Sequence, residues 1–279
     1  MKIIKDKVKY VKYKNKKLYV LNTIDKEKLN EYSEFMIGSV TKIFTIFLLL
    51  ILQQKKLLNI NDQVNKYVKS NRKNDFSKIT ILDLMNHQSG MIRGPDDSLK
   101  IYKAQNVTEV TELFIKKKLF IHNKHTYNYS NYGFLLLGRI IESVTNMSYL
   151  KAYQKYLFIP LKLNNTGIGN TNIKLYNFDK KKLTNKEYFE RYMAATAGGL
   201  YSCISDLITF FKKGIKLLNN KSIKQLKSLY IYSNKINNIN NIRHNGLIWG
   251  GYCEVSIAYD KKWKVKDDIL ISFETNLQF

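Results

Sequence analysis

Cysteine is scarce in this sequence, and so is proline. Cys203 and Cys253 are the only cysteines among 279 residues, and they do not form a CxxC pair. Two isolated cysteines support neither a zinc site nor a disulfide framework. We therefore expect two small, half-buried thiols in a reducing compartment. With only two prolines and 13% aromatic residues, the chain also lacks the composition of a disordered protein.

Long apolar runs are missing as well. The most apolar stretch, Ile43 to Leu52, is interrupted by Thr45 and is too short to cross a bilayer, so it predicts a buried helix. The N-terminal segment Met1 to Val20 is basic and contains no apolar run of signal-peptide length. We therefore expect no transmembrane segment and a cytoplasmic protein.

Acidic residues are few. The chain has 22 Asp and Glu against 47 Lys and Arg, which gives a formal net charge of +25. Such an excess is typical of proteins that bind nucleic acids. Nearly all of these basic residues are lysines spread along the whole chain, whereas nucleic-acid binders cluster their charge and use arginine for bidentate contacts. We therefore predict a basic, solvated surface and no specific nucleic-acid partner.

Strands are predicted near both ends of the chain. Alternating residues over Val8 to Tyr13 and Lys17 to Asn22 predict a β-hairpin. Two later strands are predicted at Gly251 to Tyr259 and Ile269 to Glu274. The expected fold class is α/β (α+β), with an antiparallel sheet whose first and last strands are neighbours and which is flanked by helices.

Helices are predicted between these strands. The expected ranges are Ser39 to Lys56, Ile81 to Asn86, Val107 to Lys118, Ser130 to Thr145 and Ser202 to Leu218. Asn146 can end the fourth helix in the left-handed conformation, and Ser202 or Ser205 can cap the last one. We predict one domain with a sheet lobe at about residues 1–60 and 195–279 and an inserted helical region at about 61–194. A cleft between the two parts is the expected place for a site.

Ser39-Val40-Thr41-Lys42 is an S-x-x-K motif on a predicted helix. Its serine and lysine share one helix face, so the amine can reach the hydroxyl. Burial beside neighbouring phenylalanines would lower the pKa of Lys42 and make it a base. The free N–H groups at the helix start favour a developing oxyanion. The pattern recurs at Ser70 and Ser148, but only Ser39 opens a strongly apolar helix.

Two other short motifs can carry chemistry. Tyr129-Ser130-Asn131 comes just before a predicted helix, which can aim the phenol into a cleft. His244-Asn245-Gly246 precedes a predicted strand, and its glycine lets a substrate approach the strand edge. Taken alone, the first motif is equally an ordinary helix-capping turn, and His244 is equally an ordinary loop histidine.

Together, the order and spacing of these motifs resemble the serine β-lactamase and penicillin-binding protein superfamily, in its class C and D-alanyl-D-alanine carboxypeptidase branch. Three further segments match that branch, namely Thr80 to Met91, Pro160 to Gly167 and Ala197 to Leu207. The resemblance covers nearly the whole chain. It implies a serine hydrolase of the β-lactamase-related kind and no metal or organic cofactor.

The resemblance also implies roles for individual residues. Ser39 would be the nucleophile, and Lys42 and Tyr129 would move its proton. Asn131 would orient the substrate or the lysine. The backbone N–H groups of Ser39 and Leu247 would form an oxyanion hole. The expected substrate-binding residues are Asn131, His244, Gly246 and Leu247.

The chain departs from the family at His244, where β-lactamases usually carry lysine. A histidine has an ordinary pKa of about 6.5, so it should be mostly neutral at pH 7 to 8. We therefore expect neutral ester or amide substrates to be preferred over β-lactams, which carry a free carboxylate.

The expected function is a serine hydrolase, an esterase or carboxypeptidase in type, that cleaves ester or amide bonds through an acyl-enzyme on Ser39. Its substrate would be a small-molecule or short-peptide acyl compound. A true β-lactamase or a D-alanyl-D-alanine carboxypeptidase is an alternative. A catalytically silent homologue that binds a peptide or a partner in the same cleft is another.

A second departure concerns the ends of the chain, where we expect the family's C-terminal helix and its extra N-terminal helix to be absent. In the last predicted strand, Ile269, Ile271 and Phe273 share one face, and Leu270 and Ser272 share the other. Without a covering helix, one of these faces would be exposed, and the larger one would recruit a partner. We therefore expect self-association, or a shifted helix that fills the gap.

Overall fold

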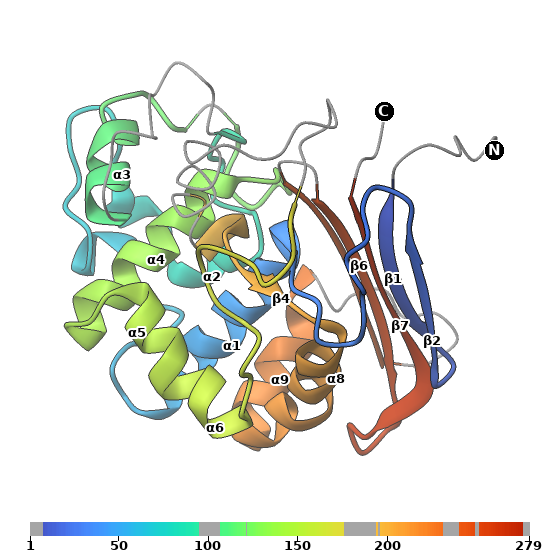
Figure 1. The fold of residues 1–279 in the computed structure, drawn as a ribbon. Coiled ribbons are helices and arrows are strands. Elements are labelled where there is room, and N and C mark those ends of the chain that lie inside the picture. Colours follow the sequence, from blue (N-terminus) through green and yellow to red (C-terminus); the bar gives the residue numbers. More distant parts are fainter. Residues whose placement is uncertain are drawn as a thin grey trace.

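The main element of the fold is a five-stranded antiparallel sheet with the order β2-β1-β7-β6-β5 (Figure 1). The computed structural model describes residues 8–94, 107–120, 122–175, 194, 196–230, 240–248 and 251–275. The strands are β1 (Lys9–Lys14), β2 (Lys17–Asn22), β5 (Asn240–Ile248), β6 (Gly251–Tyr259) and β7 (Val265–Thr275). The first strand pairs with the last, β1 with β7, as predicted from the sequence.

The β1–β2 connection is a two-residue turn. Asn15 and Lys16 both have positive φ, at 51° and 63°. This left-handed pair matches the right-handed twist of the flanking strands, which favours a tight hairpin. The predicted hairpin is therefore confirmed.

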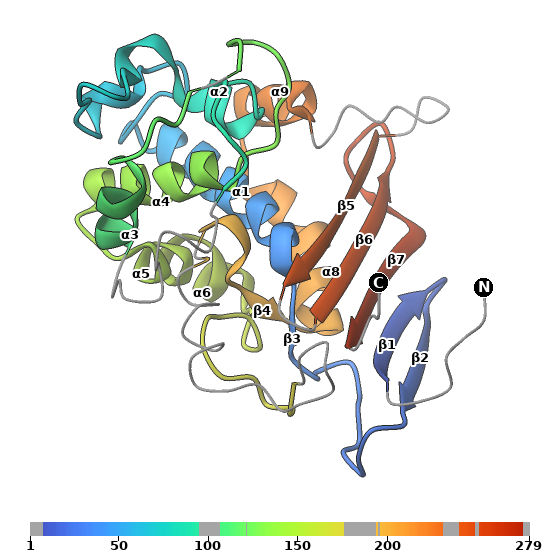
Figure 2. The ribbon, with the colours of Figure 1, turned by 90° about the horizontal axis from the view of Figure 1, so that it is seen from above.

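Helices cover one face of the sheet, as Figure 2 shows. They are α1 (Thr41–Gln54), α2 (Ile81–Met85), α3 (Val107–Phe114), α4 (Asn131–Thr145), α5 (Tyr149–Tyr153), α6 (Ile159–Leu161), α8 (Ile204–Lys213) and α9 (Asn220–Ser228). A small second sheet joins β3 (Phe35–Met36) to β4 (Tyr201–Ser202). Each helix predicted from the sequence is present, although α3 ends at Phe114 and not at Lys118.

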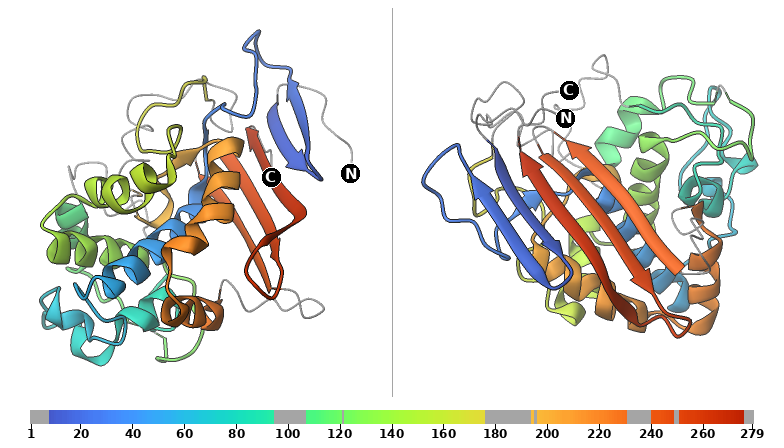
Figure 3. Two further views of the ribbon diagram at one scale, coloured as in Figure 1. Left: turned by 90° about the horizontal axis from the view of Figure 1, so that it is seen from below. Right: turned by 90° about the vertical axis from the view of Figure 1, so that its right-hand side faces the viewer.

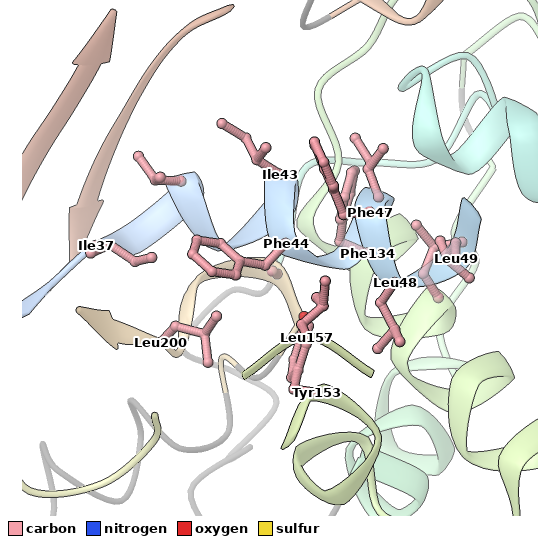
Figure 4. Packing of buried hydrophobic residues seen from close by; sticks show 14 of the residues in the cluster. Ile37, Ile43, Phe44, Phe47, Leu48, Leu49, Phe134, Tyr153, Leu157 and Leu200 are labelled. Carbon is pink, nitrogen blue, oxygen red and sulfur yellow. The ribbon is translucent and has the colours of Figure 1, made fainter. Parts of the chain in front are cut away.

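Helix α1 runs through the middle of the core (Figure 4). Every residue from Thr41 to Leu52 is buried, as expected for a helix that is apolar all round. Phe44 and Phe47 both pack on Phe210 of α8, with 3.9 Å and 4.9 Å between ring centroids, and the centroid of the Phe134 ring of α4 lies 5.3 Å from Lys42 Nζ. Burying each such side chain contributes about 1.5–3 kcal/mol, so packing on several sides holds the start of α1 in place.

The structure corrects two local predictions. The N-cap of α8 is Cys203, whose Sγ accepts a hydrogen bond from the Asp206 amide at 3.4 Å. Ser202 cannot take this role because it lies in β4 and its hydroxyl bonds to Thr166 at 2.8 Å. His244-Asn245-Gly246 lies within β5 and does not precede a strand, because pairing with β6 extends the strand over these polar residues.

The other face of the main sheet carries no helix in the described part of the chain, as the right-hand view of Figure 3 shows. Ile269, Ile271 and Phe273 of β7 nevertheless point into the core, and none is more than 4% exposed. Leu270 is half-buried on the uncovered face. The large exposed patch expected on this strand is therefore absent from the described residues, and no shifted helix fills the gap there. No helix in these ranges combines the length and apolar character of a membrane span.

Candidate active site

Ser39 lies in a 3₁₀ turn, Gly38–Val40, between β3 and α1. Gly38 has a φ of 48°, and a Cβ atom at this position would lie 2.7 Å from the backbone nitrogen of Leu247. Only glycine combines this conformation with so close an approach to another strand. The turn therefore places a half-buried Ser39 at the junction of α1 and β5, which lie side by side in Figure 2.

Lys42 lies one helical turn after Ser39 and is completely buried. Its Nζ is 3.1 Å from Ser39 Oγ, 2.8 Å from Asn131 Oδ1 and 2.6 Å from the Ala197 carbonyl oxygen. Burial, and after it the charge of Arg93, holds the pKa of Lys42 well below its usual range. A neutral amine has two N–H donors, which Asn131 and Ala197 satisfy, so its lone pair is left for the Ser39 hydroxyl. Lys42 can therefore accept the proton of Ser39.

The phenol of Tyr129 completes this chain of contacts. Its hydroxyl oxygen is 2.6 Å from Ser39 Oγ, and its ring centroid lies 4.9 Å from Lys42 Nζ. Burial raises the pKa of Tyr129, while the hydrogen bond to Ser39 and the charge of Arg93 lower it in part. The phenol is thus protonated at neutral pH and can pass a proton to and from the serine oxygen.

Hydrogen bonds and a ring contact hold the turn that carries Tyr129. Ser130 caps α4 and donates its hydroxyl proton to the Ile92 carbonyl oxygen at 2.7 Å. The Ser130 amide donates to Nδ1 of His87 at 3.1 Å, and the His87 ring packs on Tyr129 with 4.4 Å between centroids. The pKa of His87 falls to about 3, mainly through burial and then through the charges of Lys42 and His244, so its ring is neutral. The Tyr129-Ser130-Asn131 motif is therefore a helix-capping turn, and it also places Tyr129 against Ser39.

Two backbone amides meet beside Ser39. A Cβ atom on Gly246 would overlap the Ile37 carbonyl oxygen and would lie 2.6 Å from the Ser39 nitrogen. The matching close approach of Gly38 to the Leu247 nitrogen comes from the other side. The amides of Ser39 and Leu247 are therefore brought together from segments far apart in sequence. Such a pair can hold the negative oxygen of a tetrahedral intermediate.

His244 lies in β5, paired with Val255 of β6. Burial, then the charge of Lys42, lowers its pKa to about 4, against the opposing effect of a hydrogen bond with the Ser39 backbone. Since a lowered histidine pKa favours the neutral form above that pH, His244 is uncharged at pH 7. Its Nε2 atom is buried and has no hydrogen-bond partner among the described residues.

A cavity of about 490 Å³ lies beside these groups. Its described lining residues are Tyr127, Tyr129, Tyr230, Arg243, His244, Asn245, Tyr252 and Glu254. Tyr127 and Tyr230 stack with 4.2 Å between ring centroids, and Arg243 pairs with Glu254 at 3.3 Å. The described lining is therefore aromatic, and its two formal charges compensate each other. It suits an uncharged or aromatic group better than a lone carboxylate.

The structure brings the seven residues singled out in the sequence around one place. Ser39, Lys42, Tyr129 and Asn131 share hydrogen bonds, while the His244 ring and the Gly246–Leu247 backbone adjoin Ser39. Sequence reasoning missed His87 and Arg93 as parts of the site. His87 falls within the Thr80 to Met91 segment that carried the resemblance, whereas nothing in the local sequence marks Arg93.

The amino-acid sequence was also compared with known proteins. A family model described as Beta-lactamase matches residues 10–235. The teichoic acid D-alanine hydrolase of Staphylococcus aureus strain MRSA252 is 31% identical over 214 residues, which are 73% of this chain and 48% of that protein. The chain therefore spans about half the length of the curated relatives it matches.

Solved structures show the same fold. A D-stereospecific amidohydrolase from Streptomyces sp. has a TM-score of 0.74 at 20% identity, covering 96% of this chain and 88% of that one. FmtA from Staphylococcus aureus has a TM-score of 0.72 at 23% identity, covering 98% and 78%. These structures confirm the fold class predicted from the sequence.

Proposed function

Because the chain belongs to the beta-lactamase family, we propose that it is a serine hydrolase that cleaves ester or amide bonds through an acyl-enzyme on Ser39. The family resemblance inferred from the motifs is thereby confirmed. One observation carries the proposal. A fully buried lysine and a phenol contact the same serine oxygen, at 3.1 Å and 2.6 Å. This geometry lets the serine lose its proton as it attacks a carbonyl carbon.

The residues support a two-step reaction. Ser39 Oγ forms a bond to the carbonyl carbon as its proton moves to Lys42, and the resulting oxyanion is held by the amides of Ser39 and Leu247. Each such donor is worth about 3 kcal/mol in comparable sites. Tyr129 then gives a proton to the departing alcohol or amine, and the acyl group stays on Ser39. Water attacks that ester in the second step, and its proton follows the same path in reverse.

D-Alanyl esters or amides are the substrate class that we propose. The relative in Staphylococcus aureus is a teichoic acid D-alanine hydrolase, and a structural neighbour is a D-stereospecific amidohydrolase. The aromatic, charge-compensated cavity supports an uncharged leaving group beside the reacting carbonyl. The proposal predicts that D-alanine methyl ester is hydrolysed at least roughly tenfold faster than the L enantiomer, since one chiral centre then decides the fit.

Chiral analysis of the released alanine, with Ser39→Ala as the background control, measures this preference. Equal rates for the two enantiomers would contradict the D-alanyl assignment. A silent homologue would release neither enantiomer above the Ser39→Ala background. The intact contacts among Ser39, Lys42 and Tyr129 argue for activity, because a protein that only binds a partner does not need all three.

A second prediction concerns His244. Wild type should prefer p-nitrophenyl acetate to nitrocefin, because a neutral His244 offers no charged hydrogen bond to the carboxylate of a β-lactam. His244→Lys should shift the ratio of kcat/KM values towards nitrocefin by about tenfold, the difference between a charged and a neutral hydrogen bond. Asn61→Lys is the control, because it adds the same charge at an exposed residue that does not line the cavity, and it should leave the ratio nearly unchanged. A wild type that hydrolyses nitrocefin far better than the ester would exclude the preference for neutral substrates.

Two expectations from the sequence stay predictions. The assignment to the cytoplasm is one, and cell fractionation tests it. Self-association is the other. Since the apolar face of β7 is buried, self-association would need another surface, such as the exposed Leu18 to Leu21 stretch of edge strand β2. Light scattering on the purified protein measures the oligomeric state directly.

A further inference from the structure

Positive charge is unevenly distributed around the reacting groups. The titratable and charged groups described around Tyr129 and its cavity are Lys42, His87, Arg93, Tyr127, Tyr230, Arg243, His244, Tyr252 and Glu254. The two histidines have a lowered pKa and are neutral, and burial makes the neutral form of Lys42 accessible. Arg93 and Arg243 stay positively charged throughout the reaction. Arg243 pairs with Glu254 at 3.3 Å, whereas the guanidinium carbon of Arg93 lies 5.3 Å from the centroid of the Tyr129 ring.

The backbone sets the position of Arg93. Three successive carbonyl oxygens accept hydrogen bonds from the start of α4. Ile92 accepts from Ser130 Oγ at 2.7 Å, Arg93 from the Asn131 amide at 2.8 Å, and Gly94 from Asn131 Nδ2 at 2.9 Å. The segment is therefore bound to the same turn that carries Tyr129.

Gly94 lets this segment approach α4 so closely. Its φ is 32°, and a Cβ atom there would overlap the ring of Tyr132. The backbone of Arg93 is consequently fixed beside the turn that carries Tyr129, although its side chain is exposed. From this position the guanidinium reaches the face of the Tyr129 ring, which is the geometry of a cation–π contact.

The charge of Arg93 acts on both partners of Ser39. A nearby cation favours the forms of Tyr129 and Lys42 that have lost a proton, because it stabilises phenolate and disfavours ammonium. At low pH the effect on Lys42 keeps its amine in the neutral form that can accept the Ser39 proton, and the effect on Tyr129 favours negative charge beside Ser39. Arg93 is not among the described residues that line the cavity, whereas Tyr129 is, so we assign Arg93 an action through Tyr129 and Lys42.

We propose that Arg93 is a positioning residue that holds Tyr129 against Ser39 and supplies the fixed positive charge that eases proton transfer from Ser39. This inference rests on the proposed function, since it requires Ser39 to be the nucleophile.

The test is the pH profile of Ser39 labelling by a fluorophosphonate, followed by intact-protein mass spectrometry. Arg93→Met removes the charge and keeps most of the side-chain volume, and Arg93→Lys keeps the charge. We expect Arg93→Met to label roughly three- to tenfold more slowly on the acid limb and at nearly the wild-type rate on the alkaline plateau. Arg93→Lys should recover most of the rate. Added salt should reduce the difference, because the side chain is exposed.

Three results would overturn the proposal. The first is a pH profile of the labelling rate in Arg93→Met that equals that of wild type. The second is a loss of labelling rate that is the same at every pH in both variants. The third is a labelling rate in Arg93→Lys that stays as low as that of Arg93→Met. Arg93→Gln serves as a second uncharged variant, and thermal unfolding shows whether each variant is folded. Labelling that persists in Ser39→Ala would instead reject the proposed function and the role of Arg93 with it. Normal Ser39 labelling with an unchanged Arg93→Met profile would reject the role of Arg93 alone.

Discussion

Replacing Ser39 with alanine is expected to abolish labelling by a fluorophosphonate and to lower kcat for ester hydrolysis by roughly a thousandfold or more. The variant keeps Lys42 and Tyr129 but removes the oxygen that both contact. An acyl-enzyme on residue 39 then cannot form. Intact-protein mass spectrometry measures the labelling, and release of p-nitrophenol measures the hydrolysis.

Ser70→Ala and Ser148→Ala are the matched controls, because each serine opens another S-x-x-K pattern. The Ser70 hydroxyl oxygen accepts the Phe76 amide at 2.9 Å, and that of Ser148 caps α5. Both serines therefore have structural partners, and both variants should label like wild type. Labelling that survives in Ser39→Ala would show that another residue is the nucleophile.

Gly246→Ala should lower kcat by roughly a hundred- to a thousandfold, comparable to the loss of one oxyanion donor. Its new Cβ atom would overlap the Ile37 carbonyl oxygen, and the neighbouring contacts are also backbone atoms, so no flexible side chain can move away. Strand β5 would have to shift from the turn that holds Ser39. The amides of Ser39 and Leu247 would then separate.

Gly133→Ala is the control for this glycine substitution. Its Cβ atom would meet Leu84 Cδ2 at 3.5 Å, an ordinary contact, and alanine is favoured in a helix by about 1 kcal/mol. This variant should keep the wild-type kcat and unfold at the same or a higher temperature. Wild-type kcat in Gly246→Ala would mean that Leu247 is not an oxyanion donor.

The sequence did not predict strand β5 (Asn240–Ile248). Its residues Asn240 to Gly246 are mostly polar, and asparagine and glycine are depleted in strands, so the local pattern predicted a loop before a strand. The strand forms because every residue from Asn240 to Ile248 pairs with β6. His244 thereby leaves the expected loop and joins the site, where burial removes its charge.

Features that depend on residues close together in the sequence were predicted correctly in the same chain. The hairpin turn at Asn15 and Lys16, the apolar α1 helix and the Ser130 and Asn146 ends of α4 all depend on neighbours a few residues apart. The one-turn spacing of Ser39 and Lys42 has the same local origin. Conformational preferences and helical periodicity act over such distances, so the order of the residues suffices to predict them.

The sequence by itself therefore determined the family and the fold class, and it singled out Ser39, Lys42, Tyr129 and Gly246 as candidates. Only the tertiary structure decided that Arg93 lies over the Tyr129 ring, that His244 is buried and neutral, and that the apolar face of β7 is covered. The physical reason is the range of the interactions. Desolvation and charge–charge contacts depend on which distant segments pack together, and no local pattern of residues records that packing.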